Sequence, residues 1–438
     1  MADLNNFLKK IDLKQTRVGV VGMGYVGLPL ALEFCKKGFH VIGFDIDNEK
    51  VTRLNNGESY IKHIPAEAIA AARREGHFES TTDFSLISSA DAILICVPTP
   101  LGKHMEPDLS YIESTSRSIA PFIRADQLVS LESTTYPGTT EEEMIPILEK
   151  GSGIKAGTDF WVAFSPERED PNNKDYATAT IPKVVGGFTP DCLKAACALY
   201  DQIIIRTVPV SSCAAAEATK LLENIFRSVN IALMNELKVV FSKMGIDVWE
   251  VIEAAKSKPF GYMPFYPGPG LGGHCIPIDP FYLTWKAREF GIATRFIELA
   301  GEINTAMPAY VVDETMKALS NLRMALNGAK VLVVGLAYKG DVDDMRESPS
   351  LRLIELFEAA GAGVGYYDPY IPVIPPSREH GHLSGRKSIA LSEVGQFDVA
   401  VISTKHSDVD HSVFAEKCRL VMDTRNALAR NLPNVCKA

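Results

Sequence analysis

The sequence lacks several features that mark whole classes of protein. No stretch reaches the roughly 18 unbroken apolar residues of a membrane-spanning helix, and the N-terminus lacks the order of a secretory signal. The eight cysteines form no CxxC pair and no zinc-ligand spacing, which favours free thiols in a reducing compartment. We therefore expect a cytoplasmic protein that does not contact the membrane and holds no metal.

Excess positive charge is also absent. The 45 Lys and Arg residues are outnumbered by 54 Asp and Glu, and the net charge of −9 argues against a nucleic-acid-binding surface. With 46% hydrophobic and 23% charged residues, the composition is that of a globular protein. At 438 residues the chain is too long for one ordinary core, so we expect two or three domains.

A glycine-rich turn is the clearest motif near the N-terminus. Residues 17–22 predict a strand, a GxGxxG spacing follows, and the next residues predict a helix. In this motif the first glycine makes a tight turn, the second lets a pyrophosphate approach the backbone, and the third packs the helix on the strand. A second predicted strand ends in Asp45, whose carboxylate would accept from ribose hydroxyls and repel a 2′-phosphate. The pattern predicts NAD rather than NADP.

Polar residues follow three further predicted strands, at 92–97, 127–131 and 160–164. Ligands bind outside the carboxyl ends of the strands in an open parallel sheet, so these residues should face one crevice. Any one of them could equally belong to an ordinary turn. The residues expected at the crevice are Thr99, Ser133, Thr134 and Glu167.

A long helix without proline or glycine is predicted from Ala214 to about Gly245. Its polar residues Glu217, Lys220, Asn224 and Arg227 recur at a spacing that places them on one face. That face could be solvated or could line a polar cleft. The rest of the helix is apolar almost all round, which predicts a packing partner and makes a homodimer built on it plausible.

A loop rich in proline and glycine precedes the one cysteine for which we expect a chemical role. Residues 264–273 contain four glycines and three prolines, so their backbone should form neither helix nor strand and should approach another group closely. Cys275 follows, just before a predicted helix with Asp279 as N-cap and Pro280 at its first position. The positive end of the helix dipole there favours a thiolate. The remaining cysteines are expected to be small buried apolar side chains.

The last third repeats the strand and helix rhythm of the first. Apolar runs at 329–335, 363–368, 397–403 and 419–423 predict a second doubly wound unit, which lacks the glycine fingerprint. Lys339 and Arg346 lie in the polar loop after its first strand and could hold phosphates. Ordinary surface charge is the simpler interpretation of each cation alone.

These motifs, in this order, resemble the UDP-glucose/GDP-mannose dehydrogenase family of nucleotide-sugar 6-dehydrogenases over nearly the whole chain. The motifs that carry the resemblance are Gly22-Met-Gly-Tyr-Val-Gly27, Val97-Pro-Thr-Pro100, Glu132-Ser-Thr134, Ser165-Pro-Glu167-Arg168, Lys220 with Asn224, Gly272-Gly-His-Cys275 through Asp279, and Asp344-Met-Arg346-Glu-Ser-Pro349. The loop around Cys275 resembles that of the branch that oxidises UDP-N-acetylhexosamines. The resemblance favours UDP-N-acetylglucosamine as substrate, with UDP-N-acetylmannosamine, UDP-N-acetylgalactosamine and UDP-glucose as alternatives.

The resemblance implies a four-electron oxidation of a sugar C6 alcohol to a carboxylate, with two NAD per turnover, for the synthesis of surface polysaccharide precursors. The first oxidation would give an aldehyde, which Cys275 attacks to form a thiohemiacetal. The second would give a thioester, which water hydrolyses.

The resemblance also implies roles for residues around that cysteine. Lys220 and Asn224 would stabilise the oxyanion, Asp279 would orient a water as base, and Glu167 would activate the hydrolytic water held by Thr134. The residues implied to contact NAD are Gly22, Gly24, Tyr25, Val26, Gly27, Asp45, Val97, Pro98, Thr99, Ser133, Thr134, Glu167 and Arg346. Those implied to contact the UDP-sugar are Arg168, Lys220, Asn224, Arg227, Phe265, Tyr266, Gly270, Gly272, Gly273 and Lys339.

Together, pattern and resemblance predict an α/β fold with two Rossmann-like doubly wound domains joined by a long central helix. We expect an NAD-binding domain at 1–213, a central helical dimerisation domain with the cysteine loop at 214–320, and a C-terminal UDP-sugar-binding domain at 321–438, assembled as a homodimer or higher homo-oligomer. A two-electron dehydrogenase of the hydroxyacid type and a non-enzymatic NAD-responsive protein remain as alternatives. Neither of these needs the cysteine loop.

Overall fold

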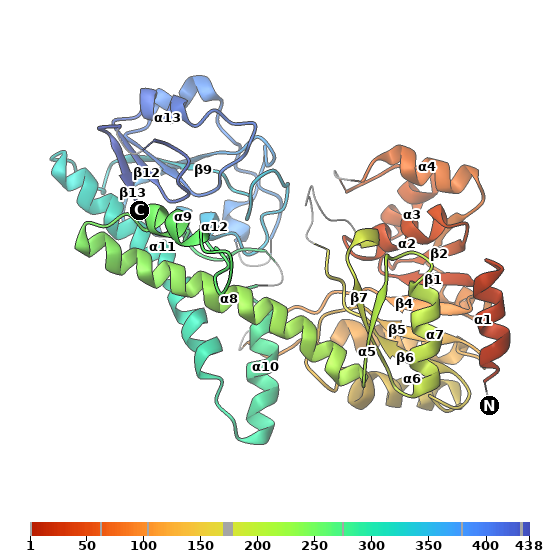
Figure 1. The fold of residues 1–438 in the computed structure, drawn as a ribbon. Coiled ribbons are helices and arrows are strands. Elements are labelled where there is room, and N and C mark those ends of the chain that lie inside the picture. Colours follow the sequence, from red (N-terminus) through yellow and green to blue (C-terminus); the bar gives the residue numbers. More distant parts are fainter. Residues whose placement is uncertain are drawn as a thin grey trace. The chain divides into compact units, whose positions relative to one another are not determined.

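The computed structural model describes residues 2–61, 64–102, 105–169, 178–273, 276–377, 380–429 and 432–438. The chain divides into two compact units, the first Met1–Glu223 with Phe281–Ile292 and the second Asn224–Pro280 with Ala293–Ala438. Each unit is built on one largely parallel sheet with helices packed on it (Figure 1). The predicted α/β fold class is confirmed, whereas the division into three functional domains stays a prediction.

The described strands of the first unit form an eight-stranded sheet in the order β3-β2-β1-β4-β5-β6-β7-β8. All neighbours are parallel except β6 and β7. The strand order reverses between β1 and β4, which is where doubly wound sheets bind ligands. The strands are β1 (Arg17–Val21), β2 (His40–Phe44), β3 (Phe78–Thr81), β4 (Ala92–Ile95), β5 (Leu128–Leu131), β6 (Trp161–Phe164), β7 (Lys183–Gly187) and β8 (Thr207–Val210).

Helices cover both faces of this sheet, which explains why its strands are apolar without alternation. Along β4, Ala92 and Leu94 pack in one core cluster with α1, α2 and α7, while Ile93 and Ile95 pack in another with α5 and α6. Successive side chains of a strand point to opposite faces, so both faces must be buried. The helices are α1 (Leu4–Asp12), α2 (Gly27–Lys36), α3 (Asn48–Asn55), α4 (Ala66–Arg74), α5 (Ser110–Ile119), α6 (Ile145–Ser152) and α7 (Pro190–Tyr200).

Strands β7 and β8 were not predicted from the sequence. Strand β7 ends in two glycines, and β8 contains Pro209, which cannot donate to the ladder. Both patterns are typical of loops. The antiparallel contact with β6 and the outer position in the sheet let these residues pair nevertheless.

The long central helix is confirmed as α8 (Cys213–Met244), which has 32 residues. Its residues to Glu223 belong to the first unit, and those from Asn224 to the second. Another long helix, α11 (Arg295–Asn321), continues through Pro308. Among the described residues, no helix is both long enough and apolar enough to cross a membrane.

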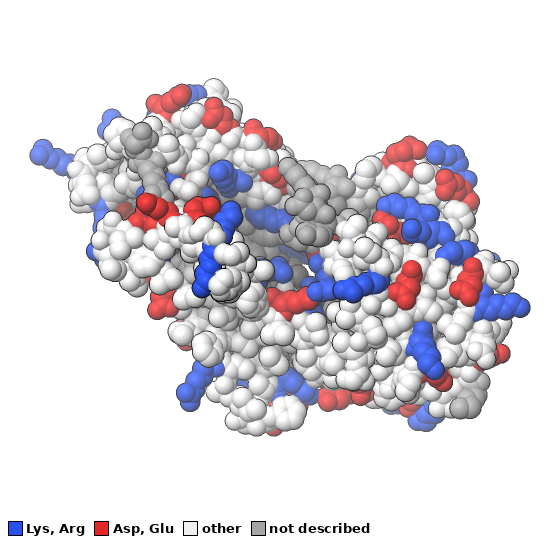
Figure 2. Space-filling view, viewed as in Figure 1, with Lys and Arg blue, Asp and Glu red and all other residues white. Residues whose placement is uncertain are grey.

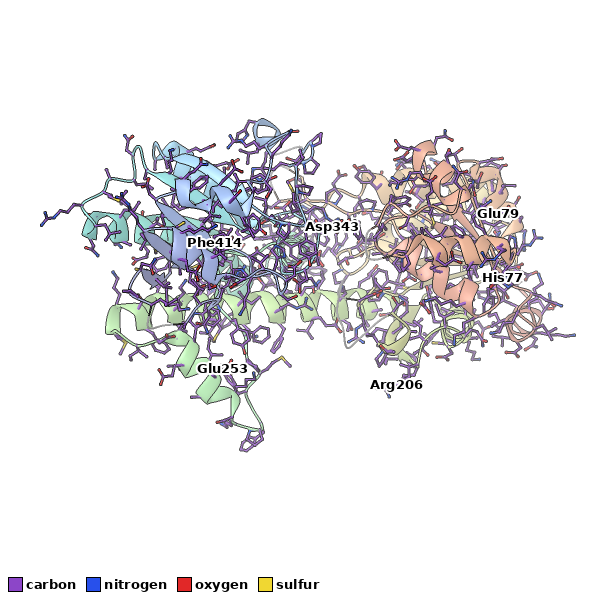
Figure 3. The ribbon with its side chains drawn as sticks, turned by 90° about the horizontal axis from the view of Figure 1, so that it is seen from above. His77, Glu79, Arg206, Glu253, Asp343 and Phe414 are labelled. Carbon is purple, nitrogen blue, oxygen red and sulfur yellow. The ribbon has the colours of Figure 1, made fainter. Side chains whose placement is uncertain are left out.

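The second unit contains the predicted second parallel sheet, in the order β10-β9-β11-β12-β13 over the described strands. Phe414, labelled in Figure 3, packs on Tyr367 with ring centroids 5.8 Å apart, which helps to bury one face of this sheet. The strands are β9 (Lys330–Val334), β10 (Gly363–Tyr367), β11 (Val399–Ile402), β12 (Leu420–Asp423) and β13 (Val435–Lys437). The further helices are α9 (Val248–Lys256), α10 (Asp279–Ala287), α12 (Pro349–Ala359) and α13 (Ser412–Lys417).

Helix α10 includes Asp279 as its first residue, so the predicted N-cap lies one position inside the helix.

On the face drawn in Figure 2, basic and acidic side chains are interspersed with neutral ones over both units. This mixture agrees with the modest net charge of −9.

Candidate functional site

The glycine turn after β1 has the geometry that its sequence predicts. Gly22 has φ +95°, and a Cβ there would lie 2.6 Å from the carbonyl oxygen of Cys96. A Cβ on Gly27 would lie 1.9 Å from the carbonyl oxygen of Gly22, so helix α2 packs directly on the turn. A Cβ on Gly24 would meet no atom within 4 Å. The first and third glycines are therefore required by the fold, whereas the second leaves open space of the kind a pyrophosphate needs.

Asp45 directly follows β2 and lies against the same turn. Its Oδ2 accepts from the backbone N–H of Met23 at 3.0 Å, and the ammonium of Lys50 lies 3.6 Å from that oxygen. Tyr25, at the tip of the turn, is 37% exposed. An acceptor beside the open space at Gly24 fits the ribose and pyrophosphate of NAD.

The carboxyl ends of β4 and β5 bring four predicted residues together. The Thr99 hydroxyl donates to the carbonyl of Thr134 at 2.7 Å, and the Ser133 hydroxyl donates to the carbonyl of Val97 at 2.7 Å. Tyr282 of α10 donates its hydroxyl to the carbonyl of Thr99. Three of the four residues expected at one edge of the first sheet, Thr99, Ser133 and Thr134, thus lie together with Val97, and the ligand contacts of all of them stay predictions.

A buried lysine, missed in the sequence, holds the loop that carries Glu167. The ammonium of Lys183 donates to Glu132 at 2.6 Å and to the carbonyl of Pro166 at 3.3 Å, and it lies 3.9 Å from Oε2 of Glu167. Burial alone would lower the pKa of Lys183, but the charges of Glu132 and Glu167 outweigh burial and raise it. The lysine therefore stays charged. In the sequence, the one sign of such an ion pair would have been a lysine at a strand position that the fold buries.

Lys220 also reaches this loop, because its ammonium donates to the carbonyl of Glu167 at 2.7 Å. The polar residues predicted to share one face of α8 differ in their surroundings. Glu217 accepts from the backbone N–H groups of Gly138 and Thr140, so it anchors a turn rather than lining a cleft. Arg227 is exposed. The helix face is therefore partly structural.

Arg168 is already engaged within the first unit. Its guanidinium donates to Glu223 at 2.5 Å and to the carbonyl of Pro182 at 2.6 Å. Contact with a substrate would have to share or replace these bonds, so its substrate role stays a prediction that the geometry does not favour.

In the second unit, Asn224 and Asp279 lie together. The Asn224 amide donates to Oδ2 of Asp279 at 2.6 Å, and both side chains are buried. Two of the residues implied to surround the reacting carbon are therefore neighbours. Cys275 itself lies outside the described residues.

The glycine-rich loop approaches another loop of the second unit rather than open space. A Cβ on Gly272 would lie 2.7 Å from Cβ of Tyr338 and 3.0 Å from the carbonyl oxygen of Glu347. The N–H of Gly273 donates to the carbonyl of Arg346 at 3.0 Å. A Cβ on Gly270 would touch Pro349 at 3.0 Å. The close backbone approach that we predicted is present, and it positions this loop on the segment that follows β9.

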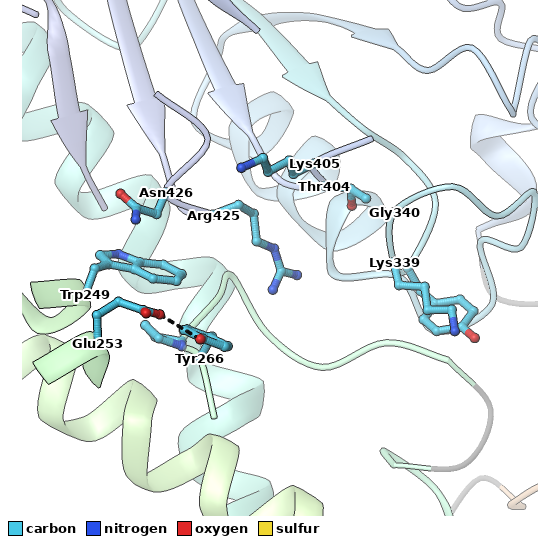
Figure 4. A pocket seen from close by; sticks show the side chains of 11 residues that line it. Trp249, Glu253, Tyr266, Lys339, Gly340, Thr404, Lys405, Arg425 and Asn426 are labelled. Atoms are coloured by element: carbon cyan, nitrogen blue, oxygen red, sulfur yellow. Dashed lines mark hydrogen bonds between the residues drawn. The ribbon is translucent and has the colours of Figure 1, made fainter. Parts of the chain in front are cut away.

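A cavity of about 400 Å³ lies in the second unit, which we call the second-unit cavity (Figure 4). Tyr266 stacks on Trp249 with ring centroids 5.7 Å apart, and its hydroxyl donates to Glu253 at 2.7 Å. The guanidinium of Arg425 points toward the middle of the cavity. The lining residues are Trp249, Glu253, Tyr266, Pro267, Tyr338, Lys339, Gly340, Thr404, Lys405, Arg425 and Asn426. Of these, only Tyr266 and Lys339 were predicted.

Two cations of the cavity that the sequence analysis did not predict lie where ligands usually bind in a parallel sheet. Lys405 and Arg425 lie just after β11 and β12, at the carboxyl ends of parallel strands. Two other predicted residues lie outside the cavity lining. Phe265 packs on Phe226 with ring centroids 5.6 Å apart, and Arg346 pairs with Asp344 at 2.6 Å. Among the described residues, no group of three or more His, Cys, Asp or Glu could hold a metal ion.

Comparison with known proteins covers almost the entire chain. Models of the UDP-glucose/GDP-mannose dehydrogenase family match as its NAD binding domain at residues 16–204, its central domain at 214–306 and its UDP binding domain at 332–430. A UDP-N-acetyl-D-glucosamine 6-dehydrogenase of Pseudomonas aeruginosa is 36% identical over 90% of this chain and 92% of its own. An NDP-N-acetyl-D-galactosaminuronic acid dehydrogenase of Ralstonia solanacearum is 34% identical over 95% and 97%.

A solved structure agrees with these similarities. That of a UDP-D-ManNAc dehydrogenase from Pyrococcus horikoshii superposes with a TM-score of 0.86 at 32% identity, covering 96% of this chain and 98% of that one. The order of the motifs, the two sheets and the matches to the family models all indicate the same family. The chain belongs to the UDP-glucose/GDP-mannose dehydrogenase family and is an oxidoreductase that uses NAD.

Proposed function

We propose that this protein oxidises the C6 alcohol of a UDP-N-acetylhexosamine to the uronic acid, with UDP-N-acetylglucosamine as the preferred substrate. Relatives at 34% to 36% identity are named for N-acetylglucosamine and N-acetylgalactosaminuronic acid nucleotides, and the solved relative is named for N-acetylmannosamine. These names support an acetamido sugar but differ in its epimer. The preference for the gluco epimer rests on the loop around Cys275.

The observation that carries the proposal is the second-unit cavity. Its volume of about 400 Å³ falls within the range of small-molecule sites, and it lies mostly in the segment matched as a UDP binding domain. The Trp249 and Tyr266 rings offer an aromatic surface to a base. Lys339, Lys405 and Arg425 supply three positive charges for a diphosphate. An aromatic surface next to clustered cations is what a uridine diphosphate requires.

The chemistry proposed for the chain centres on Cys275. NAD, when bound, would supply the hydride acceptor, with one NAD used for each of the two oxidations. The thiolate of Cys275 adds to the aldehyde carbon, and the alkoxide takes up a proton to give a thiohemiacetal; loss of that hydroxyl proton and of the second hydride leaves a thioester. Water then breaks the carbon–sulfur bond, which releases the carboxylate and returns the thiol. Lys220 and Asn224 are proposed to stabilise the oxyanions, and Glu167 to accept the proton of the attacking water.

A panel of nucleotide sugars tests the substrate. Purified protein with NAD should form NADH most efficiently, in kcat/KM, with UDP-N-acetylglucosamine, ahead of UDP-N-acetylmannosamine, UDP-N-acetylgalactosamine and UDP-glucose. Two NADH should appear for each acid that mass spectrometry detects. A higher kcat/KM for UDP-glucose would refute the acetamido preference, and one NADH per product would point to a two-electron dehydrogenase.

Replacement of the thiol tests the mechanism. Cys275→Ala should lower acid formation by several orders of magnitude, because the covalent route is removed while nucleotide binding elsewhere is kept. Cys197→Ala, at a half-buried cysteine of α7, is the matched control and should keep full activity. Near-normal acid formation by Cys275→Ala would mean that the aldehyde is oxidised as its hydrate, without a thioester.

We also propose a homodimer formed through α8. Leu222, Phe226, Leu233, Val240 and Met244 are each at least 45% exposed and recur at a spacing that places them along one side of the helix. A single apolar stripe is self-complementary, so it suits a two-fold contact. Light scattering should give about twice the 47.9 kDa of one chain, and Leu233→Glu should give monomers. A wild-type monomer at micromolar concentration would refute this.

A further inference from the structure

Helix α8 buries a lysine that donates no hydrogen bond to any residue that the structure describes. Lys238 is 3% exposed, and its ammonium nitrogen is bonded to no other described residue. The nearest ring, that of Tyr310 on α11, has its centroid 5.5 Å from this nitrogen. Burial of an unpaired ammonium is costly, and proteins usually pair such a group or leave it neutral. Lys238 therefore requires an explanation.

The charged groups that face Lys238 do not neutralise it. Arg425 carries the same charge. Of the two acids that act on Lys238, Asp423 has the larger effect, but its oxygens already accept from the ammonium of Lys437 at 2.6 Å and from backbone N–H groups after β12. Glu314 of α11 is paired with Lys317 at 2.7 Å. Burial, and after it the charge of Arg425, lower the pKa of Lys238 to about 7, against weaker effects of Asp423 and Glu314.

Arg425 connects this lysine to the second-unit cavity. The Arg425 guanidinium lines the cavity and donates through Nε to the carbonyl of Ser403 at 2.7 Å. It packs on Gly268, where a Cβ would lie 2.3 Å from Nη1. The N–H of Gly268 donates to Asn235 at 2.9 Å, and Asn235 lies one turn before Lys238 on α8. Lys238 is not itself a lining residue, but the contacts of Asn235 with Gly268 and of Gly268 with Arg425 connect its part of α8 to the cation that lines the cavity.

We propose that Lys238 takes up a proton when an anionic diphosphate occupies the second-unit cavity, so that nucleotide-sugar binding is linked to pH. The inference rests on the proposed function, because it takes a UDP-sugar as the occupant. The two negative charges of a diphosphate offset the positive charge of Arg425, which is the main charge acting against the ammonium. Above pH 7, Lys238 thus adds a positive charge only when the cavity holds an anion, and the empty protein avoids adding a buried positive charge to that of Arg425.

The direction of the pH dependence follows from this linkage. Below pH 7 the free protein already holds the proton, so binding takes up none and affinity is highest. Above pH 7 the free amine is neutral, and binding must take up a proton from solution. Affinity should then fall by up to tenfold per pH unit, until the pH reaches the higher pKa of the bound state.

Calorimetry tests the proposal without turnover. UDP-N-acetylglucosamine, whose diphosphate does not titrate near neutrality, is added to the full protein without NAD at pH 8, in buffers of different ionisation enthalpy. The wild type should take up between half and one proton at pH 8 and less than a third of a proton at pH 6. Lys238→Met, which keeps most of the side-chain volume, should take up none at either pH. Lys243→Met, at an exposed lysine of the same helix, is the matched control and should behave as the wild type.

Each outcome decides between the two claims. Binding without proton uptake by the wild type, or uptake that persists in Lys238→Met, overturns the role of Lys238 and leaves the proposed function intact. No binding of any UDP-sugar overturns the proposed function, and this inference with it. The wild-type measurements at two pH values keep the proposal testable even if Lys238→Met does not fold.

Discussion

The first strand of each sheet leads into a glycine with positive φ, +95° at Gly22 after β1 and +83° at Gly335 after β9. In both cases the glycine N–H donates at 2.8 Å to the last residue of the neighbouring strand, Phe44 or Tyr367. An aspartate follows each neighbouring strand and accepts from backbone N–H groups of the turn, Asp45 in the first sheet and Asp368 in the second. The two units therefore share one local structure at the point where a doubly wound sheet binds its ligand.

The two aspartates differ in what surrounds them. Asp45 bonds to two backbone N–H groups and has the open space of Gly24 beside it. Asp368 accepts from the N–H groups of Leu336 and Ala337 at 2.6 and 2.9 Å, and His406 lies 3.1 Å from the same oxygen. Helix α2 starts directly at its turn, whereas α12 starts only at Pro349.

The difference shows how one backbone geometry can serve two purposes. In the first unit the turn leaves room for a phosphate at a helix N-terminus. In the second unit the turn is closed by hydrogen bonds, and the cavity forms beside it instead. There the positive charge comes from side chains, Lys405 and Arg425, rather than from a helix N-terminus.

The largest difference between the two units should appear when each aspartate loses its charge. Burial alone would raise the pKa of Asp368, but the hydrogen bonds from His406, Ala337 and Leu336 outweigh burial and lower it, so this group is ionised in the folded protein. Asp368→Asn directs an amide toward N–H donors and should lower the free energy of unfolding by about 3 to 5 kcal/mol. Asp45→Asn should cost about 1 kcal/mol. Urea unfolding of both variants checks the comparison, and equal costs would contradict it.

The second effect concerns the open space at Gly24. Gly24 lacks a positive φ and its Cβ position is empty, so Gly24→Ala should change the unfolding free energy by less than about 1 kcal/mol. The added methyl group should nevertheless keep the pyrophosphate from the backbone and weaken NAD binding on the order of tenfold to a hundredfold. Fluorescence titration with NAD measures this loss.

Gly395→Ala is the control for that variant, since its Cβ position is also empty and it lies outside the glycine turn. It should alter neither stability nor NAD affinity. Unchanged NAD affinity in Gly24→Ala would mean that the open space beside the turn is not where the pyrophosphate binds.

The comparison also separates what the sequence could predict from what it could not. The glycine turn and Asp45 were predicted because neighbouring residues in the chain form them, and their geometry is set by local backbone rules. The second-unit cavity joins Trp249, Tyr266, Lys339 and Arg425 from four separate segments. No local pattern specifies which turn of a helix faces which strand end, so these contacts could not be derived.

Buried ion pairs could not be predicted from the sequence for the same reason. Lys183 lies 51 residues from its partner Glu132 along the chain. Taken alone, neither charged residue has a sequence context that indicates a buried ion pair. The residues that reach the Glu167 loop, Lys183 and Lys220, come from a strand and a helix that only the folded chain brings together.

The smallest effect we expect is on the choice between the two nicotinamide cofactors. Asp45→Asn removes the charge that would repel a 2′-phosphate, and it leaves Lys50, now 3.6 Å from the carboxylate, available to attract that phosphate. The ratio of kcat/KM for NADP to that for NAD should rise by about tenfold, or about 1.4 kcal/mol. Asp47→Asn is the control for general charge loss, because Asn still caps α3 in place of Asp47, and it should leave the ratio unchanged. Equal shifts in both variants would mean that net charge near the turn, rather than the position of Asp45 beside the ribose, sets cofactor preference.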